Sequence, residues 1–400
     1  MAEAALSSQR GVLGYLRRAV VLASLALVAA CSSGRVIPES APPPVVKAPP
    51  PVAPRPISPG LPQDVARHRV ALLVPLTGSN AGVGNSLNNA TQLALLDSQS
   101  EAVRITTYDT AKGAAAAAQR AIDEGNKLIL GPLLADDVRT VLPIARAAHV
   151  PVLSFSNDAS VAGNGAWLLG YSPTQSIERV VDFAKESGIS NFVGLMPSGV
   201  YGERASTAFL RAVEASGGKV LALETYDRAP GSMNGAIARL NKAPYQAVLL
   251  AGPANSAAVA VPVIRRNGGA SARLLGTELW NSDSGIGANA ALNGAWFASV
   301  PNKYYRQYAG KYRARFGSAP YRLSTLGYDS VLLTVRIARD WHPGDDFPVA
   351  RLSDRDGFVG LDGAFRFGRD GIAERALEVQ EIKGGTTIAV SPAPTGFGGK

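Results

Sequence analysis

The sequence of 400 residues contains one cysteine, Cys31, so no disulfide can form within the chain. The folded part must therefore be stabilised by its hydrophobic core. The apolar stretch at residues 20–30 is too short for a membrane-spanning helix, and no later stretch approaches the roughly 20 apolar residues that such a helix needs. We therefore expect no transmembrane helix in the mature protein.

Histidine is also scarce, and the motifs of common enzymes are missing. The three histidines show no HExxH spacing, and the sequence contains neither a GxxxxGK[ST] phosphate loop nor a GxSxG motif. Gly82-Val83-Gly84 lacks the third glycine of a dinucleotide-binding loop. We interpret residues 342–346 as a solvated loop, and a weak cation site is the alternative. We expect no catalytic residues, no metal and no cofactor, and hence a protein that is not an enzyme.

The first 30 residues have the order of a secretory signal, with Arg10, Arg17 and Arg18 followed by the apolar stretch. Val28-Ala29-Ala30-Cys31 ends this segment and resembles a bacterial lipobox, in which the cysteine thiol receives the lipid. We expect residues 1–30 to be a signal peptide and Cys31 to be the lipidation site. Ser32 in place of aspartate favours the periplasmic face of the outer membrane. The alternative is that Cys31 is an incidental residue of a secreted signal.

Proline is concentrated in residues 37–62, which excludes regular helix or sheet there. We interpret residues 31–67 as a lipidated cysteine followed by a semi-rigid tether. In polyproline II form the proline-rich part would span on the order of 70–80 Å. Docking of this segment on a proline-binding partner is the alternative.

From residue 68 onward, short apolar runs alternate with amphipathic stretches, which is typical of βαβ units. The first series predicts four strands, at residues 70–74, 103–108, 128–130 and 150–153, with helices between them. A second series predicts strands at residues 192–196, 220–224, 247–251 and 274–276. The pattern therefore indicates an α/β protein with two lobes, each a parallel sheet flanked by helices.

Ligands bind parallel sheets at the carboxyl ends of the strands, where the loops converge. In the first lobe these loops offer the ligand candidates Thr77, Ser79, Asn80, Ser154, Ser156 and Asn157. Because every parallel sheet has such loops, ordinary βα turns remain the alternative for each of them.

Several of these segments resemble the type I periplasmic binding proteins of the leucine/isoleucine/valine-binding class. The matching motifs are Leu73-Val74-Pro75-Leu76-Thr77-Gly78 with Gly84, Ile129-Leu130-Gly131-Pro132, Tyr201-Gly202 before a helix, and Gly327-Tyr328-Asp329-Ser330. The resemblance covers residues 68–400 and implies two lobes joined by a three-stranded hinge. It implies a first lobe of about residues 68–170 and 282–341, and a second lobe of about residues 171–281 and 342–400.

The resemblance also implies that Tyr201 and Glu278 contact a ligand from the second lobe. The loop after the third strand departs from the amino-acid transporter pattern, because Leu133-Leu134-Ala135 replaces its serines. Those residues offer no side-chain donor to a carboxylate, which argues against binding of a free amino acid. Glu278 could instead be a surface residue of a turn.

Within this superfamily the chain is similar to the penicillin-binding protein activator lipoproteins. The lipobox, the tether, and residues 360–367 followed by Asp370-Gly371 carry this similarity. It implies a lipoprotein that binds a class A, bifunctional penicillin-binding protein and stimulates peptidoglycan synthesis. A helical repeat domain found in the enterobacterial members is not seen here. The alternative function is a solute receptor of an ABC transporter, and the ligand would be a small polar molecule or a peptidoglycan fragment.

The net charge of +9 is spread along the chain, with a local concentration of basic residues and tyrosines between residues 303 and 322. Such a surface suits a protein contact, because aromatic and guanidinium groups dominate interface energetics. The candidates for this partner face are Tyr304, Tyr305, Arg306, Tyr308 and Arg313. The alternative is a solvated helix whose tyrosines pack inward. The expected location excludes a nucleic-acid partner.

Overall fold

A computed structural model describes residues 67–240 and 244–397. The predicted signal peptide, the lipidation site Cys31 and almost all of the predicted tether lie outside these residues. Within the described part, no helix has both the length and the apolar character that crossing a bilayer requires.

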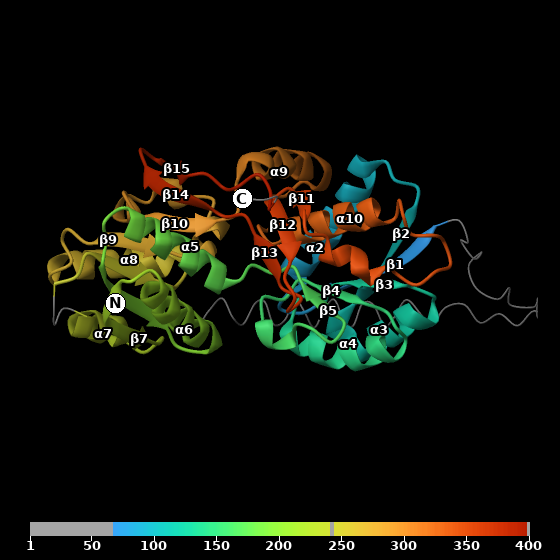
Figure 1. The fold of residues 1–400 in the computed structure, drawn as a ribbon, viewed down its shortest axis with the longest axis horizontal. Coiled ribbons are helices and arrows are strands. Elements are labelled where there is room, and N and C mark those ends of the chain that lie inside the picture. Colours follow the sequence, from blue (N-terminus) through green and yellow to red (C-terminus); the bar gives the residue numbers. More distant parts are fainter. Residues whose placement is uncertain (1–66, 241–243, 398–400) are drawn as a thin grey trace, which may run out of the picture. The chain divides into compact units, whose positions relative to one another are not determined.

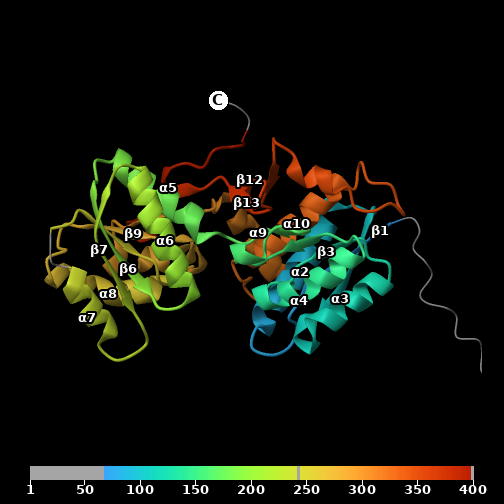
Figure 2. The ribbon, with the colours of Figure 1, turned by 60° about the horizontal axis from the view of Figure 1, so that its bottom comes forward.

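The first sheet contains the four predicted strands and a fifth, in the order β2-β1-β3-β4-β5, and all its pairings are parallel. Its strands are β1 (His68–Val74), β2 (Val103–Asp109), β3 (Leu128–Leu130), β4 (Val152–Ser154) and β5 (Ala166–Leu168). The helices between them are α2 (Ala81–Ser98), α3 (Ala114–Asp123) and α4 (Ala135–Ala147). Alternate residues of β1 face two separate cores, so helices cover both faces of the sheet. Figures 1 and 2 show α3 and α4 together on one of these faces.

The second sheet has seven strands in the order β15-β14-β10-β9-β8-β6-β7. Its parallel strands are β6 (Asn191–Pro197), β7 (Lys219–Tyr226), β8 (Ala247–Leu250), β9 (Arg273–Gly276) and β10 (Trp296–Ser299). Its antiparallel strands are β14 (Glu378–Lys383) and β15 (Thr386–Ser391). Helices α5 (Pro173–Glu186) and α6 (Val200–Ala215) pack on one face, and α7 (Ser232–Leu240) and α8 (Ala254–Arg266) pack on the other.

The first lobe is completed by segments late in the chain. Helices α9 (Lys303–Phe316) and α10 (Ser324–Ile337) join its core, and α10 lies against α2. A small antiparallel sheet follows, made of β11 (Phe358–Gly360), β12 (Gly363–Phe367) and β13 (Ala373–Arg375). Its phenylalanines belong to the same core, so this sheet is part of the first lobe (Figure 1).

The first crossing between the lobes lies near residue 170, because Leu169 belongs to the first-lobe core and Ile177 to a second-lobe core, and the other two crossings lie later in the chain than expected. The second crossing follows β10, because Phe297 is fully buried among the residues of the second lobe. The third follows β13, because Trp341, Phe347 and Phe358 pack into the first-lobe core. In the described part of the chain, the second crossing therefore lies near residue 300 and not near 281, and the third lies near residue 376 and not near 341.

The two lobes open with the same local construction. A strand ends at a proline or directly before one, and a glycine in the first turns of the next helix packs directly on the carbonyl oxygen of that proline. A Cβ atom on Gly84 would lie 1.7 Å from Pro75 O, and one on Gly202 would lie 1.6 Å from Pro197 O. Only glycine allows this approach, which fixes the start of each helix against the end of its strand.

Candidate functional site

Most first-lobe hydroxyl groups that were predicted to contact a ligand instead form hydrogen bonds within their own loops. Ser154 is fully buried, donates to Pro132 O over 2.9 Å and accepts from the Ser156 amide. Ser156 in turn accepts from the Asp158 amide, and Thr77 donates to Asp109 Oδ2 over 2.9 Å. These contacts favour the alternative of structured βα turns for Ser154, Ser156 and Thr77.

The remaining first-lobe candidates do not gather at one point. Ser79 and Asn157 are exposed, and Asn80 precedes α2 without forming a side-chain cap. Asn157 lies at a pocket of about 330 Å³ that it shares with Arg204 and Arg211 of the second lobe. The structure therefore brings Asn157, and not Ser79 or Asn80, to a space between the lobes.

Tyr201 and Glu278, the second-lobe pair, do lie together. The Tyr201 hydroxyl donates to Glu278 Oε1 over 3.0 Å and lies 3.0 Å from Thr277 Oγ1. Burial raises the pKa of Glu278 to about 7, although the Tyr201 hydrogen bond opposes this rise. Burial likewise raises the pKa of Tyr201. Glu278 is therefore not a surface residue of a turn.

Glu278 borders a small cavity where the two lobes and their connecting segments meet, here called the interlobe cavity. Its polar and charged lining includes Tyr171, Gln175, Glu278, Asn281, Arg322 and Arg375. Its volume is about 20 Å³. That is space for about one water molecule, so a whole amino acid does not fit in this conformation.

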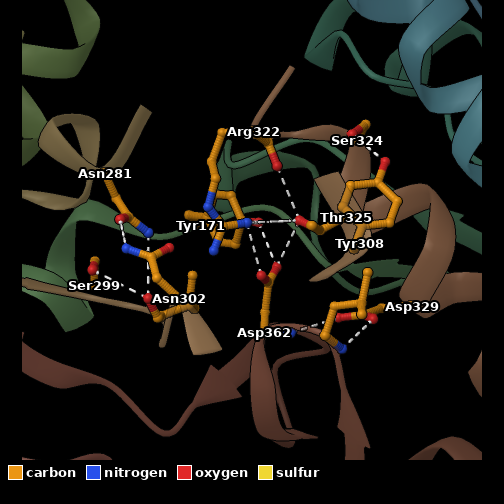
Figure 3. A network of polar contacts seen from close by, with 12 residues as sticks. Tyr171, Asn281, Ser299, Asn302, Tyr308, Arg322, Ser324, Thr325, Asp329 and Asp362 are labelled. Atoms are coloured by element: carbon orange, nitrogen blue, oxygen red, sulfur yellow. Dashed lines mark hydrogen bonds and ion pairs between the residues drawn. The ribbon is translucent and has the colours of Figure 1, made fainter. Parts of the chain in front are cut away.

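Beside the cavity, Asp362 is the centre of a buried polar network (Figure 3). Its Oδ1 lies 2.8 Å from Arg322 Nη1, and its Oδ2 accepts from Tyr171 and Thr325 over 2.5 and 2.8 Å. Burial would raise the pKa of Asp362, but Arg322 and Arg375 hold it below its usual range. The network joins the first crossing, the start of α10 and the β11–β12 turn.

A second carboxylate, Asp329 of α10, organises that turn. It accepts from the Leu361 amide over 2.7 Å and from the Asp362 amide over 3.4 Å. A Cβ atom on Gly360 would lie 2.3 Å from Asp329 Cγ. Burial and the nearby Asp362 charge raise the pKa of Asp329. The motifs at residues 327–330 and 360–367 therefore meet in space and hold the β11–β12 turn against α10.

An ion pair links the lobes at their edge. Arg204 of α6 pairs with Asp158, which follows β4, and Arg139 of the first lobe lies 3.2 Å from the same carboxylate. Burial opposes the ionisation of Asp158, but the Arg204 and Ser160 hydrogen bonds lower its pKa. Arg204 therefore contacts the first lobe directly.

The predicted partner face is only partly at the surface. Tyr308 is 2% exposed, and its hydroxyl lies 2.6 Å from Ser324 Oγ, so including it in a contact face was wrong. Tyr305 is half-buried against the Arg322 guanidinium. Tyr304, Arg306 and Arg313 are exposed on α9. The tyrosines on the inner side of this helix pack inward, as the alternative proposed.

Sequence reasoning did not select Arg375 or Tyr171 as site residues, and it placed Arg322 only in a basic surface cluster. These residues lie far apart in the sequence, and no motif spacing links them. Residues 171, 322, 362 and 375 come together only because the chain crosses between the lobes. The one available signal was Asp362, which lies within the motif at residues 360–367.

Two α/β lobes joined by three crossings, with polar residues of both lobes meeting between them, define a two-lobed binding protein. The described residues contain no group of histidine, cysteine and acidic side chains that could hold a metal. Residues 68–386 match the family model of periplasmic binding proteins, and the chain belongs to this family. The family has a ligand-binding fold.

Solved structures show the same fold. A leucine-binding protein of Thermotoga maritima is 20% identical, with a TM-score of 0.60 over 82% of this chain and 98% of that one. A putative branched-chain amino acid ABC transporter protein of Rhodospirillum rubrum is 19% identical, with a TM-score of 0.72 over 81% of this chain and 100% of that one. Full-length LpoA of Haemophilus influenzae is 18% identical, with a TM-score of 0.63 over 82% of this chain and 60% of that one.

Among curated proteins, an uncharacterised protein of Rickettsia prowazekii is 22% identical over 174 residues, which is 43% of this chain. The match spans 47% of that relative, about half of its length.

Proposed function

We propose that the chain is a periplasmic lipoprotein, anchored in the outer membrane through Cys31, that binds and activates a class A penicillin-binding protein without catalysing a reaction. The small volume of the interlobe cavity carries this proposal, because a transport receptor that used Glu278 would need space for its solute beside that residue. The apolar Leu133-Leu134-Ala135 segment adds support, since it gives no side-chain donor to an amino-acid carboxylate. The similarity to LpoA and the periplasmic family agree with this function.

The proposed contact is the exposed side of α9, with Tyr304, Arg306 and Arg313. Tyr304 is 47% exposed and has Lys303 over its ring at 5.4 Å from the centroid. An exposed aromatic ring beside several cations is the composition of an interface anchor.

The test combines a pull-down with an assay of glycan-chain synthesis, using the full chain in detergent and a purified class A penicillin-binding protein. We expect binding and faster synthesis, and a loss of binding of about tenfold or more in a Tyr304→Ala, Arg313→Ala double variant. The matched control is Leu210→Ala, Arg211→Ala, an exposed pair on α6 of the other lobe. Absence of both binding and stimulation with the unaltered chain would refute the proposal.

A solute receptor remains the second candidate, favoured by the Tyr201 and Glu278 pair. Glu278 Oε2 is buried and has no hydrogen-bond partner in the described part of the chain, so it could receive an ammonium group from a ligand. Calorimetry with a panel of amino acids separates the two candidates. Micromolar binding of an amino acid without contact to the synthase would favour the receptor.

A further inference from the structure

Helix α9 presents more positive charge to solvent than the described residues neutralise. It contains five basic residues and no acidic one. Among these five, only Lys311 forms an ion pair within the described ranges, with Asp97 Oδ2 over 3.0 Å. The exposed basic residues without such a partner are Lys303, Arg306, Arg313 and Arg315. The outer side of α9 is therefore a basic surface that lacks counter-charges in the described part of the chain.

The start of α9 carries charge of the unfavourable sign for a helix. The free amide groups of a helix N-terminus give it a partial positive charge, so cations in the first turn destabilise the helix. Lys303 and Arg306 lie in this turn without an acidic residue beside them, and Asn302 forms no side-chain cap. Helix stability therefore does not explain these two cations, whereas binding of an anionic surface would.

Beside this end of α9 lies a groove of about 300 Å³, here called the α9 groove. Tyr305 and Arg306 of the first lobe line one of its walls. Residues 283–288 and 385–387 of the second lobe line the other wall. A Cβ atom on Gly287 would lie 2.6 Å from the Cα atom of Thr386, so these two segments are in contact and form one surface. A segment that passes from α9 into the groove would therefore touch both lobes.

The lining of the α9 groove is largely polar and has little net charge. Its charged residues are Asp283 and Arg306, and uncharged polar side chains come from Ser284, Asn302 and Thr387. This lining suits the backbone and side chains of an extended peptide, whereas a flat layer of lipid headgroups would not enter a groove. The arginines beside it offer paired N–H groups that match the two oxygens of a carboxylate.

We propose that the class A penicillin-binding protein docks here through an acidic segment, which lies along α9 and ends in the α9 groove against the second lobe. This inference rests on the proposed function and adds to it the charge of the partner segment and the contact with the second lobe. Attraction between opposite charges speeds association and makes the affinity fall as salt is added. Because each lobe forms one wall of the groove, the bound segment also links α9 to residues 283–288.

Biolayer interferometry of the full chain in detergent, with a purified class A penicillin-binding protein, tests the charge of the contact. We expect the Kd to rise about tenfold or more between about 50 and about 500 mM NaCl. The Lys303→Glu, Arg306→Gln variant should raise the Kd about tenfold at the lowest salt concentration and flatten the salt dependence. Glutamine is used at position 306 because the half-buried Glu378 lies near enough to interact with Arg306.

The matched control is Lys219→Glu, Arg228→Gln, which changes the charge equally at the opposite edge of the second sheet from β15. Both of these side chains are exposed. The α9 variant should unfold at the same temperature as the unaltered chain or at a higher one, because glutamate in the first turn suits the helix dipole. Loss of binding in that variant is then separated from loss of the fold.

A second variant tests the groove and leaves every cation of α9 in place. Ser284→Trp fills the groove from the second lobe, so we expect the Kd to rise about tenfold. Ser187→Trp is its control, because Ser187 is exposed at the end of α5 in the same lobe.

The inference is overturned, and the proposed function stands, if the synthase binds with an affinity that neither salt nor either variant changes. Absence of binding by the unaltered chain at the lowest salt concentration refutes both. Flotation of the Cys31→Ser chain with phosphatidylglycerol vesicles is measured in parallel. If the α9 variant abolishes this flotation but keeps its affinity for the synthase, the basic surface binds lipid and the inference is also overturned.

Discussion

Glu278 is the residue whose environment has the clearest thermodynamic consequence. Its ordinary pKa of 4.5 applies in the unfolded chain, whereas burial raises the pKa to about 7 in the folded protein. Between these two values the folded state therefore binds more protons than the unfolded state. Stability must then fall as the pH rises from 4.5 through 7, and the loss is complete above the folded pKa.

The Glu278→Gln variant should remove this pH dependence. A shift from 4.5 to about 7 corresponds to roughly 3 kcal/mol, so the stability of the unaltered protein relative to the variant should fall by about that amount between pH 4.5 and pH 8. Urea denaturation of both proteins at several pH values measures the difference. Parallel curves would show that Glu278 titrates normally.

Single residues also show where sequence reasoning reaches its limit. Ser154 ends the parallel strand β4, Glu278 follows the parallel strand β9, and both were predicted to be ligand contacts. Ser154 is used by the loop itself through Pro132 O, whereas Glu278 has a buried oxygen left free. Only the path of the neighbouring backbone separates these two cases, and the residue type does not contain that information.

At the scale of elements, the apolar runs were sufficient to predict the parallel strands of both sheets up to β9, with the exception of the short strand β5. Buried parallel strands have continuous apolar sequences, which makes them visible without a structure. Among the later strands, β10 was missed although it is buried and parallel to β9. β11 was missed because it is short and partly exposed, and β14 was missed because it has the mixed pattern of an antiparallel strand. The lobe boundaries depend on these strands, which explains why two crossings were placed too early.

Substitution of the two glycines that contact proline carbonyls tests the shared construction of the lobes. Gly84→Ala or Gly202→Ala would force a Cβ atom to within 1.7 or 1.6 Å of a backbone oxygen, so α2 or α6 must move. We expect each to cost about 2 kcal/mol or more in the free energy of unfolding.

Gly310→Ala is the matched control, because Gly310 lies within α9 and nothing approaches its Cβ position within 4 Å. This substitution should stabilise the protein by up to about 1 kcal/mol through helix propensity. Thermal unfolding of the three variants measures the contrast. Equal effects at all three positions would mean that the close contacts with Pro75 and Pro197 do not constrain the helices.

At the scale of the whole described domain, three crossings and several side-chain contacts connect the lobes, among them Gln175 on α5, which donates to Ala373 O and accepts from the Arg375 amide. The crossings near residues 170 and 376 lie against the buried network around Asp362 and Arg375. Near the second crossing, Asn302 donates to Asn281 Oδ1 over 2.6 Å (Figure 3). The ion pair between Arg204 and Asp158 lies outside this region and is the contact most easily removed without disturbing either core.

Removal of this ion pair should shift the domain toward more open arrangements. Arg204→Ala deletes the contact from the second lobe, and a partly exposed pair of this kind is worth up to about 1 kcal/mol, a several-fold change in population.

Cys31→Ser removes the only native thiol, so Thr140→Cys on α4 and Leu210→Cys on α6 can carry spin labels. Distances from double electron-electron resonance should lengthen and broaden in Arg204→Ala. Arg139→Ala removes the partner of Asp158 from the same lobe and should leave the distances unchanged. An identical distribution in all three proteins would show that this ion pair does not set the arrangement of the lobes.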